Sequence, residues 1–249
     1  MLYFLVLMAF YRRRTALSLR PRRDALEDGV PGEVLATGLP ACLMTLCENV
    51  SYAVLDNLMA LSGTVMQAGI GVAKKVNMLA HCMARGMSQG VLPLIGFNYA
   101  AGRSRRMKQA VVLSMGISVA LATVWMAASL SFGDGMVGVF IRHDSGSVDF
   151  GAAFLRILCL GGPFSACAYA FISFFQAVGK SRKSFMLAIL RKGVLDIPLM
   201  FLLARRGPVY GVVWATPIAD ALCCAVAVAT FLHFLHSLNG VRRMLARSL

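Results

Sequence analysis

The chain has 249 residues, of which 58% are hydrophobic and only 14% charged, and its mean hydropathy is +0.71. A water-soluble globular domain has about 25% charged residues, so this composition excludes a protein that covers itself with polar surface in water. The net charge is +14 and the isoelectric point about 10.1, but the basic residues stand in short clusters between apolar runs. That pattern excludes a nucleic-acid-binding surface and indicates loops beside a lipid bilayer.

Residues 1–11, MLYFLVLMAFY, form an apolar stretch. The stretch is too short to cross a bilayer core of about 30 Å, which takes about 20 residues. It is not predicted to be a signal peptide, because arginines follow it and no small-residue cleavage site is present. We expect the end of a truncated transmembrane helix here, followed at 12–33 by a basic cytoplasmic loop with six arginines.

Six later runs are long and apolar enough to be transmembrane helices. The sequence therefore predicts an all-α, polytopic membrane protein whose six-helix part covers residues 34–238. The expected spans are 35–60, 69–97, 108–132, 150–177, 184–204 and 210–236.

The connections between these spans alternate in charge. Basic clusters recur at 98–108, at 179–184 and in the tail 239–249, whereas 60–68 has no charge and 133–149 contains three aspartates. Because cytoplasmic loops carry an excess of Lys and Arg, the basic connections and the C-terminus are predicted to be cytoplasmic.

Five predicted spans contain a proline, a residue that interrupts the hydrogen bonds of a helix. Such interruptions at membrane depth occur where protein or a water-filled path satisfies the backbone, although proline is also commoner in membrane helices in general. Both interpretations stay open. The prolines are Pro40, Pro93, Pro163, Pro198 and Pro217.

Charged residues within the spans are candidate functional residues, since a charge near the middle of a bilayer costs about 3 kcal/mol. Glu48 lies near the middle of the first full span, and Tyr52 and Asp56 follow at intervals of four on the same helix face. Asn49 borders that face.

The next span carries cations at matching depths. If the two helices are antiparallel neighbours, Glu48 lies at the depth of Arg85, and Asp56 at that of Lys74 and Lys75. Glu48 is then either a proton- or cation-binding carboxylate on a central cavity or half of a structural ion pair with Arg85. For Asp56 the structural pair is the favoured interpretation.

Asp196 and Asp220 stand close to Pro198 and Pro217 and are further candidates for a cavity or an ion pair. Gln176 and Arg191 flank the basic turn at 179–184, so we interpret them as interfacial anchors or turn-capping groups.

The cysteines and histidines indicate no metal site. The seven cysteines lie in apolar runs without a CxxC motif, and the four histidines do not cluster with carboxylates. No nucleotide-binding loop, catalytic triad or cofactor fingerprint occurs, so the chain is predicted not to be an enzyme and to need no cofactor beyond a coupling ion.

Several stretches, in chain order, resemble the C-terminal lobe of multidrug and toxic compound extrusion (MATE) transporters of the bacterial type. GLPACLMTL resembles the first helix of that lobe, and GMSQGVLPLIGFNYAAG the exit of its second. FISFFQAVGKSRKSFMLAILRKGVLDIPLMFLL resembles the fourth and fifth helices, and GVVWATPIAD the last.

The resemblance implies a fold of twelve helices in two lobes, of which this chain holds the second. It implies multidrug efflux by antiport, in which a small organic, usually cationic, drug leaves as Na⁺ or H⁺ enters. Alternating access would come from one lobe rocking against the other in the bacterial inner (plasma) membrane. The partner is then a missing N-terminal lobe or a second copy of this chain. Gln89, Asn98 and Tyr99 are expected to shape the kinked cytoplasmic exit of the second helix.

The resemblance also implies a role for Glu48, which falls where some branches of the family place a cation-coupling glutamate. In the branch that the chain otherwise resembles, that position is usually uncharged. Arg85 and Asp196 likewise stand where the family is usually apolar. Two alternatives to efflux therefore stay open: a non-transporting truncated remnant, and a flippase of lipid-linked precursors, for which a strongly cationic cavity is expected.

Overall fold

The computed structural model describes residues 6, 10, 30–141, 145–207 and 209–247. The predictions for residues 1–11 and for the arginines of 12–29 therefore lie outside the described residues, apart from positions 6 and 10, which are helical. No β-strand occurs in the described ranges, and the predicted all-α fold is confirmed.

The described helices group into six segments that correspond in order to the six predicted spans. Three of them are single helices in the first half of the chain: α3 (Val30–Ala60), α4 (Thr64–Ala100) and α5 (Ser104–Gly138). The fourth is bent and consists of α6 (Ser145–Leu158), the 3₁₀ turn η1 (Cys159–Gly161) and α7 (Gly162–Ala177). The fifth joins α8 (Ser181–Ile189), the π-helix η2 (Leu190–Asp196) and α9 (Ile197–Ala204), and α10 (Tyr210–Arg247) is the sixth.

The helices extend beyond the predicted spans at several ends. The loop expected at 133–149 was wrong in its first part, because α5 continues to Gly138 past a kink at Phe132. Likewise α10 runs to Arg247, so the backbone of the expected tail is helical almost to its end.

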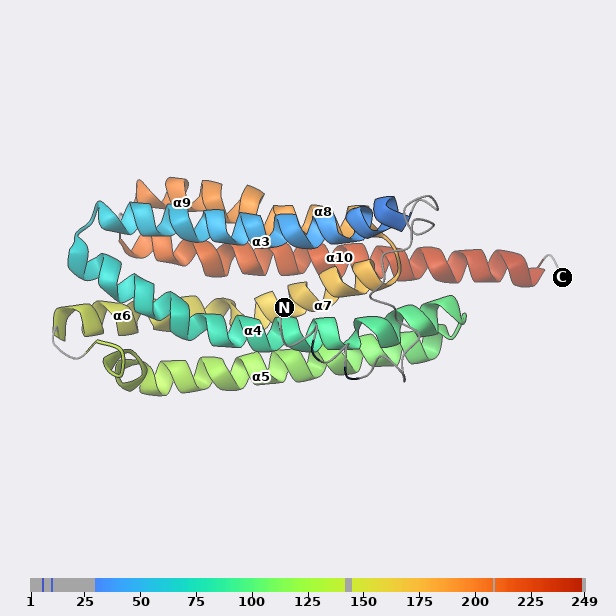
Figure 1. Ribbon diagram of the computed structural model, residues 1–249, viewed down its shortest axis with the longest axis horizontal. Helices are drawn as coiled ribbons and strands as arrows, with labels where there is room; N and C mark the ends of the chain where they lie inside the picture. Colours follow the sequence, from blue (N-terminus) through green and yellow to red (C-terminus); the bar gives the residue numbers. More distant parts are fainter. Residues whose placement is uncertain (1–5, 7–9, 11–29, 142–144, 208, 248–249) are drawn as a thin grey trace. The chain divides into compact units, whose positions relative to one another are not determined.

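The chain divides within α3 into two units, Met1–Leu39 and Pro40–Leu249. In the second unit α4 packs against α5, α6 and α7, and α10 packs against α7, α9 and η2 (Figure 1). All the contacts described below lie in this second unit.

Two apolar clusters form the core, and a polar layer separates them. Along α4, Ile70 and Ala73 belong to one cluster and Ile95 to the other. Along α10, Val212 likewise belongs to the first cluster and Phe231 to the second. Between them lies what we call the buried polar layer: Glu48, Ser51, Asn77, His81, Arg85, Tyr169, Arg191, Lys192, Asp196, Thr216 and Asp220.

The bends in the fourth and fifth spans follow from glycine and proline. At Gly161 a Cβ atom would lie 3.0 Å from Asp220 Oδ2 and 3.3 Å from Pro217 Cα, so glycine lets α10 approach closely without displacing these atoms. Pro198 cannot donate a backbone hydrogen bond and would crowd the carbonyl four residues earlier. The wider turn of η2 ends two residues before it. Such π-helical turns are frequent at functional sites.

Helix α4 approaches α6 closely at one glycine, and this contact yields a stability prediction. A Cβ atom at Gly69 would lie 2.9 Å from the backbone nitrogen of Gly151 and 3.0 Å from the carbonyl oxygen of Ser147. Backbone atoms cannot move aside as a flexible side chain can, so Gly69→Ala is expected to destabilise the fold by about 1–3 kcal/mol. Thermal unfolding in detergent measures the change.

Gly71 provides the matched control on the same helix, because no atom lies within 4 Å of a Cβ built there. Gly71→Ala should stabilise α4 by about 0.5–1 kcal/mol, since alanine loses less backbone freedom than glycine in a helix. Equal shifts in Tm for the two variants would contradict the close-approach argument.

Among the described helices, three are long and apolar enough to cross a membrane: Ser104–Gly138, Gly146–Ala177 and Tyr210–Ser237. The other three spans, α3, α4 and the α8–α9 helix, carry most of the charges of the buried polar layer. Because isolated charges are costly in a bilayer, these helices depend on one another to neutralise them.

Candidate functional site

Glu48 is the centre of contacts among three helices. Its carboxylate accepts an ion-paired hydrogen bond from Arg85 of α4. It also accepts a hydrogen bond of 2.9 Å from the hydroxyl of Tyr169 on α7. Arg85 in turn donates to the same hydroxyl oxygen at 3.1 Å. The depth match between Glu48 and Arg85 that the sequence predicted is confirmed, and Tyr169 is added to it.

Arg191 and Asp220 form a second ion pair that is almost completely buried. Arg191 Nε donates to Asp220 Oδ1 at 2.7 Å, and the two side chains are 2% and 1% exposed. The guanidinium also lies 4.3 Å from the centre of the Tyr169 ring and 3.4 Å from Nδ1 of His81. Tyr169 therefore contacts both this pair and the Glu48 pair.

A third pair lies within η2 itself. Lys192 donates to Asp196 Oδ2 at 2.8 Å, with both side chains buried. Two hydroxyl groups donate to the same carboxylate: Ser51 of α3 at 2.6 Å and Thr216 of α10 at 3.1 Å. Asp196 thus connects three helices, because its two oxygens accept from all of them.

The remaining candidates on α3 lie nearer the surface. Asp56 is ion-paired with Lys74, as the depth match predicted, and its side chain is 43% exposed. The ring of Tyr52 lies 5.3 Å from Nζ of Lys74 and 5.6 Å from Nζ of Lys192. Asn49 is exposed and donates to the carbonyl of Thr45 in its own helix, so its hydrogen bond does not join it to the buried polar layer.

The buried polar layer balances its charges. Glu48, Asp196 and Asp220 face Arg85, Arg191 and Lys192, and each carboxylate has one ion-paired cation. Its hydrogen bonding is nevertheless incomplete: among the described residues, Asp220 Oδ2, Asn77 Oδ1 and Arg85 Nε are buried without a partner. Unpaired buried polar atoms are uncommon and mark places where water, an ion or a second arrangement can be accommodated.

Sequence reasoning missed more than half of this layer. The interpretation of Arg191 as an interfacial anchor or cap was wrong, since the residue is 1% exposed and paired with Asp220. Lys192, His81 and Tyr169 were not proposed as site residues. The available signal was the Arg191-Lys192 dipeptide inside a predicted span, with Asp196 one helical turn after Lys192.

The residues expected at the exit of the second helix take part in smaller contacts. Gln89 donates to Ser173 and to Gln176, each at 3.3 Å, and so joins α4 to α7. Asn98 donates to the carbonyl of Leu94 at 2.8 Å.

Within the described residues, no group of three or more His, Cys, Asp or Glu side chains could hold a metal ion.

Comparison with known proteins places this architecture in a family. The MatE family model matches residues 40–202, from α3 into α9. The multidrug export protein MepA of Staphylococcus aureus is 28% identical over 211 residues, which are 84% of this chain and 45% of that protein. MepA of Staphylococcus saprophyticus is 26% identical over 210 residues, with the same shares of the two chains.

Solved structures show the same fold. The outward-facing structure of a multidrug resistance MATE family transporter of the MOP superfamily superposes with a TM-score of 0.83 at 19% identity. The match covers 96% of this chain and 54% of that one. This chain therefore spans about half the length of the proteins that it matches. Because the family model covers most of the chain and the fold agrees, the chain belongs to the MatE family of membrane transporters.

Proposed function

We propose that this chain is one lobe of a secondary active multidrug exporter, in which a cation, Na⁺ or H⁺, enters as a drug leaves. Membership of the MatE family and the similarity to multidrug export proteins support export of small organic compounds. The observation that carries the coupling step is the buried carboxylate of Glu48. Arg85 of α4 and the hydroxyl group of Tyr169 on α7 hold this carboxylate in place.

The proposed step is an exchange of partners at Glu48. An entering proton or Na⁺ neutralises the carboxylate and weakens its attraction for Arg85. The Arg85 side chain is 33% exposed, so it can turn toward water at a lower cost than a fully buried cation. Release of Arg85 and of the Tyr169 hydroxyl removes the polar link among α3, α4 and α7, which lets these helices shift as the lobe rocks.

A second lobe is needed for a closed cavity. We propose that it is an N-terminal lobe or a second copy of this chain, in the bacterial inner membrane with the C-terminus cytoplasmic. The basic connections at 98–108 and 179–184 support this orientation, since cytoplasmic loops are rich in Lys and Arg.

The flippase alternative receives less support from the charges. Of the cations that suggested it, Lys74 is paired with Asp56 and Arg85 with Glu48, and Lys75 is exposed. A layer whose charges cancel offers little attraction for a polyanionic lipid-linked precursor.

Transport in proteoliposomes tests the proposal. Vesicles containing the chain and loaded with a fluorescent organic cation are expected to release it when an inward proton or Na⁺ gradient is imposed, and to stop when an ionophore removes the gradient. A two-copy particle should have about twice the 26.8 kDa mass of the chain. Preparations of that mass with no gradient-dependent release would contradict transport by two copies, and failure of the chain together with an N-terminal lobe as well would contradict the proposal.

A further inference from the structure

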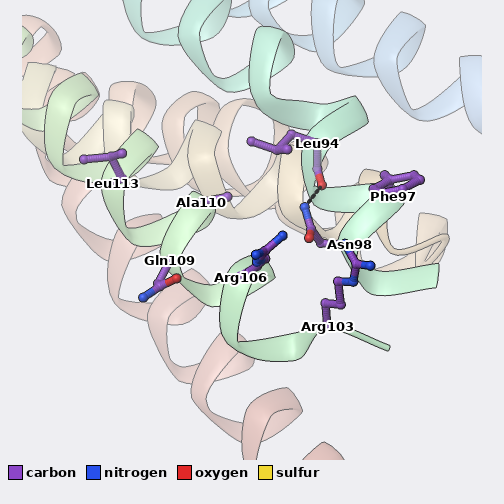
Figure 2. A pocket seen from close by; sticks show the side chains of 8 residues that line it. All are labelled: Leu94, Phe97, Asn98, Arg103, Arg106, Gln109, Ala110 and Leu113. Atoms are coloured by element: carbon purple, nitrogen blue, oxygen red, sulfur yellow. Dashed lines mark hydrogen bonds between the residues drawn. The ribbon is translucent and has the colours of Figure 1, made fainter. Parts of the chain in front are cut away.

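The turn between α4 and α5 forms an amphiphilic pocket. Its volume is about 360 Å³, and Figure 2 shows Arg103 and Arg106 at one side and leucine and phenylalanine side chains at the other. In Figure 2 the guanidinium of Arg106 points from α5 toward Asn98 of α4. The lining residues are Leu94, Phe97, Asn98, Arg103, Arg106, Gln109, Ala110 and Leu113.

In the part of the chain that the structure describes, no carboxylate pairs with the cations of this pocket. Arg103 and Arg106 are exposed, and among the described residues neither forms an ion pair. The sequence contains no acidic residue between Asp56 and Asp134. Arg105 adds a third guanidinium, because a neighbouring hollow is lined by Arg103, Arg105 and Arg106. Among the described residues no carboxylate balances these guanidinium groups, which makes them available to an anionic ligand.

The apolar part of the pocket indicates what kind of molecule this is. Leu94, Phe97 and Leu113 are 53%, 65% and 66% exposed, in a chain that belongs to a family of membrane transporters. Leu113 follows Arg106 by two helical turns on α5, which is about 10 Å along the helix axis. A ligand with an anionic head and a hydrocarbon tail matches both ends, whereas a free phosphate would leave the apolar end uncovered.

The turn between α7 and α8 is a natural comparison. It repeats the same pattern, AVGKSRK against AAGRSRR. Gly102 and Gly179 have φ angles of 69° and 71°, and in each turn the next amide donates at 2.9 Å to the carbonyl five residues earlier. In the second turn, however, Lys183 already lies 5.3 Å from the Phe234 ring and 5.6 Å from the Phe175 ring.

We propose that the pocket between α4 and α5 binds an anionic phospholipid, with the phosphate on Arg103 and Arg106 and an acyl chain along Leu94 and Leu113. Basic pockets between transmembrane helices are suited to anionic headgroups because the bilayer supplies the acyl chains in place. This site is separate from the buried polar layer, so it stands independently of the proposed coupling at Glu48.

Native mass spectrometry of the full chain in detergent tests the site, with titration of phosphatidylglycerol or phosphatidylcholine of the same acyl chains. The double variant Arg103→Gln/Arg106→Gln is expected to weaken phosphatidylglycerol binding by about tenfold or more and to leave phosphatidylcholine binding unchanged. The matched control, Lys180→Gln/Arg182→Gln, removes the same charge from exposed positions of the other turn. It should change the affinity by less than about threefold.

Equal losses in the two double variants would overturn the proposal, because they would indicate diffuse attraction to a basic surface. No loss in either variant would overturn it as well. Glycerol phosphate separates a lipid from its free headgroup: it should not compete at concentrations where phosphatidylglycerol saturates the site. Leu113→Asn should weaken phosphatidylglycerol binding while Tm is unchanged, and full competition by glycerol phosphate would exclude a lipid site.

Discussion

Replacing Asp220 with asparagine is expected to lower the free energy of unfolding by about 3–5 kcal/mol, because it leaves a buried cation without its partner. The carboxylate of Asp220 accepts from Arg191 Nε at 2.7 Å, and the two side chains are only 2% and 1% exposed. Bulk water therefore has little access to the charge that is left behind. The midpoint of unfolding, measured by circular dichroism in detergent, should fall accordingly.

Two further variants separate the ion pair from other causes. Arg191→Met alone should also destabilise the fold, but the double variant Arg191→Met/Asp220→Asn should be more stable than either single variant, because no unpaired charge is left. Asp134→Asn removes an aspartate from a pair that is 62% and 41% exposed, so a change of at most about 1 kcal/mol is expected. If Asp220→Asn behaved like Asp134→Asn, the buried pair would not hold the layer together.

Replacing Glu48 with glutamine is expected to abolish gradient-driven export while the amount of protein in the membrane is unchanged. Glutamine is nearly isosteric but can neither take up a proton nor balance a cation at physiological pH. Arg85 keeps its contact with Tyr169 at 3.1 Å and is 33% exposed, so the variant should fold. The measurement is release of a fluorescent organic cation from proteoliposomes, with the protein amount determined by immunoblot.

Asp56→Asn is the matched control for Glu48→Gln, since Asp56 is also an ion-paired carboxylate of α3 but lies nearer the surface. It should retain most of the transport. The exchanged pair Glu48→Arg with Arg85→Glu restores the ion pair without restoring the position of the acid. If that variant is expressed and transports, Glu48 is a structural partner and the coupling proposal fails.

The pairs on α3 and α4 could be predicted because they need only the helix period and one antiparallel contact. Glu48 and Asp56 recur on one face of α3, and the ion pairs with Arg85 and Lys74 follow from matching depths on the neighbouring helix. The sequence could not distinguish a relay from a structural pair, because both interpretations place the same residues at the same depth.

The Arg191–Asp220 pair could not be predicted in the same way. If the fifth span is taken as a regular helix that begins at the 179–184 turn, Arg191 is interpreted as an anchor at the membrane interface. That interpretation was wrong, because Arg191 is buried. The π-helical turn at Leu190–Asp196 changes the direction of the side chains that follow α8. This turn packs against α10, which carries Asp220, and a contact between two spans is not visible in the pattern of either one.

By itself the sequence determined the membrane as the solvent, the all-α fold and the six spans, because hydropathy and charge pattern are local properties that the bilayer selects directly. Only the tertiary structure decided which charges meet. Tyr169 contacts both Glu48 and Arg191, and Asp196 accepts hydrogen bonds from three helices, although these partners are up to 145 positions apart in the chain. Such contacts depend on helix rotation, bends and depth together, and no pattern within one span contains that information.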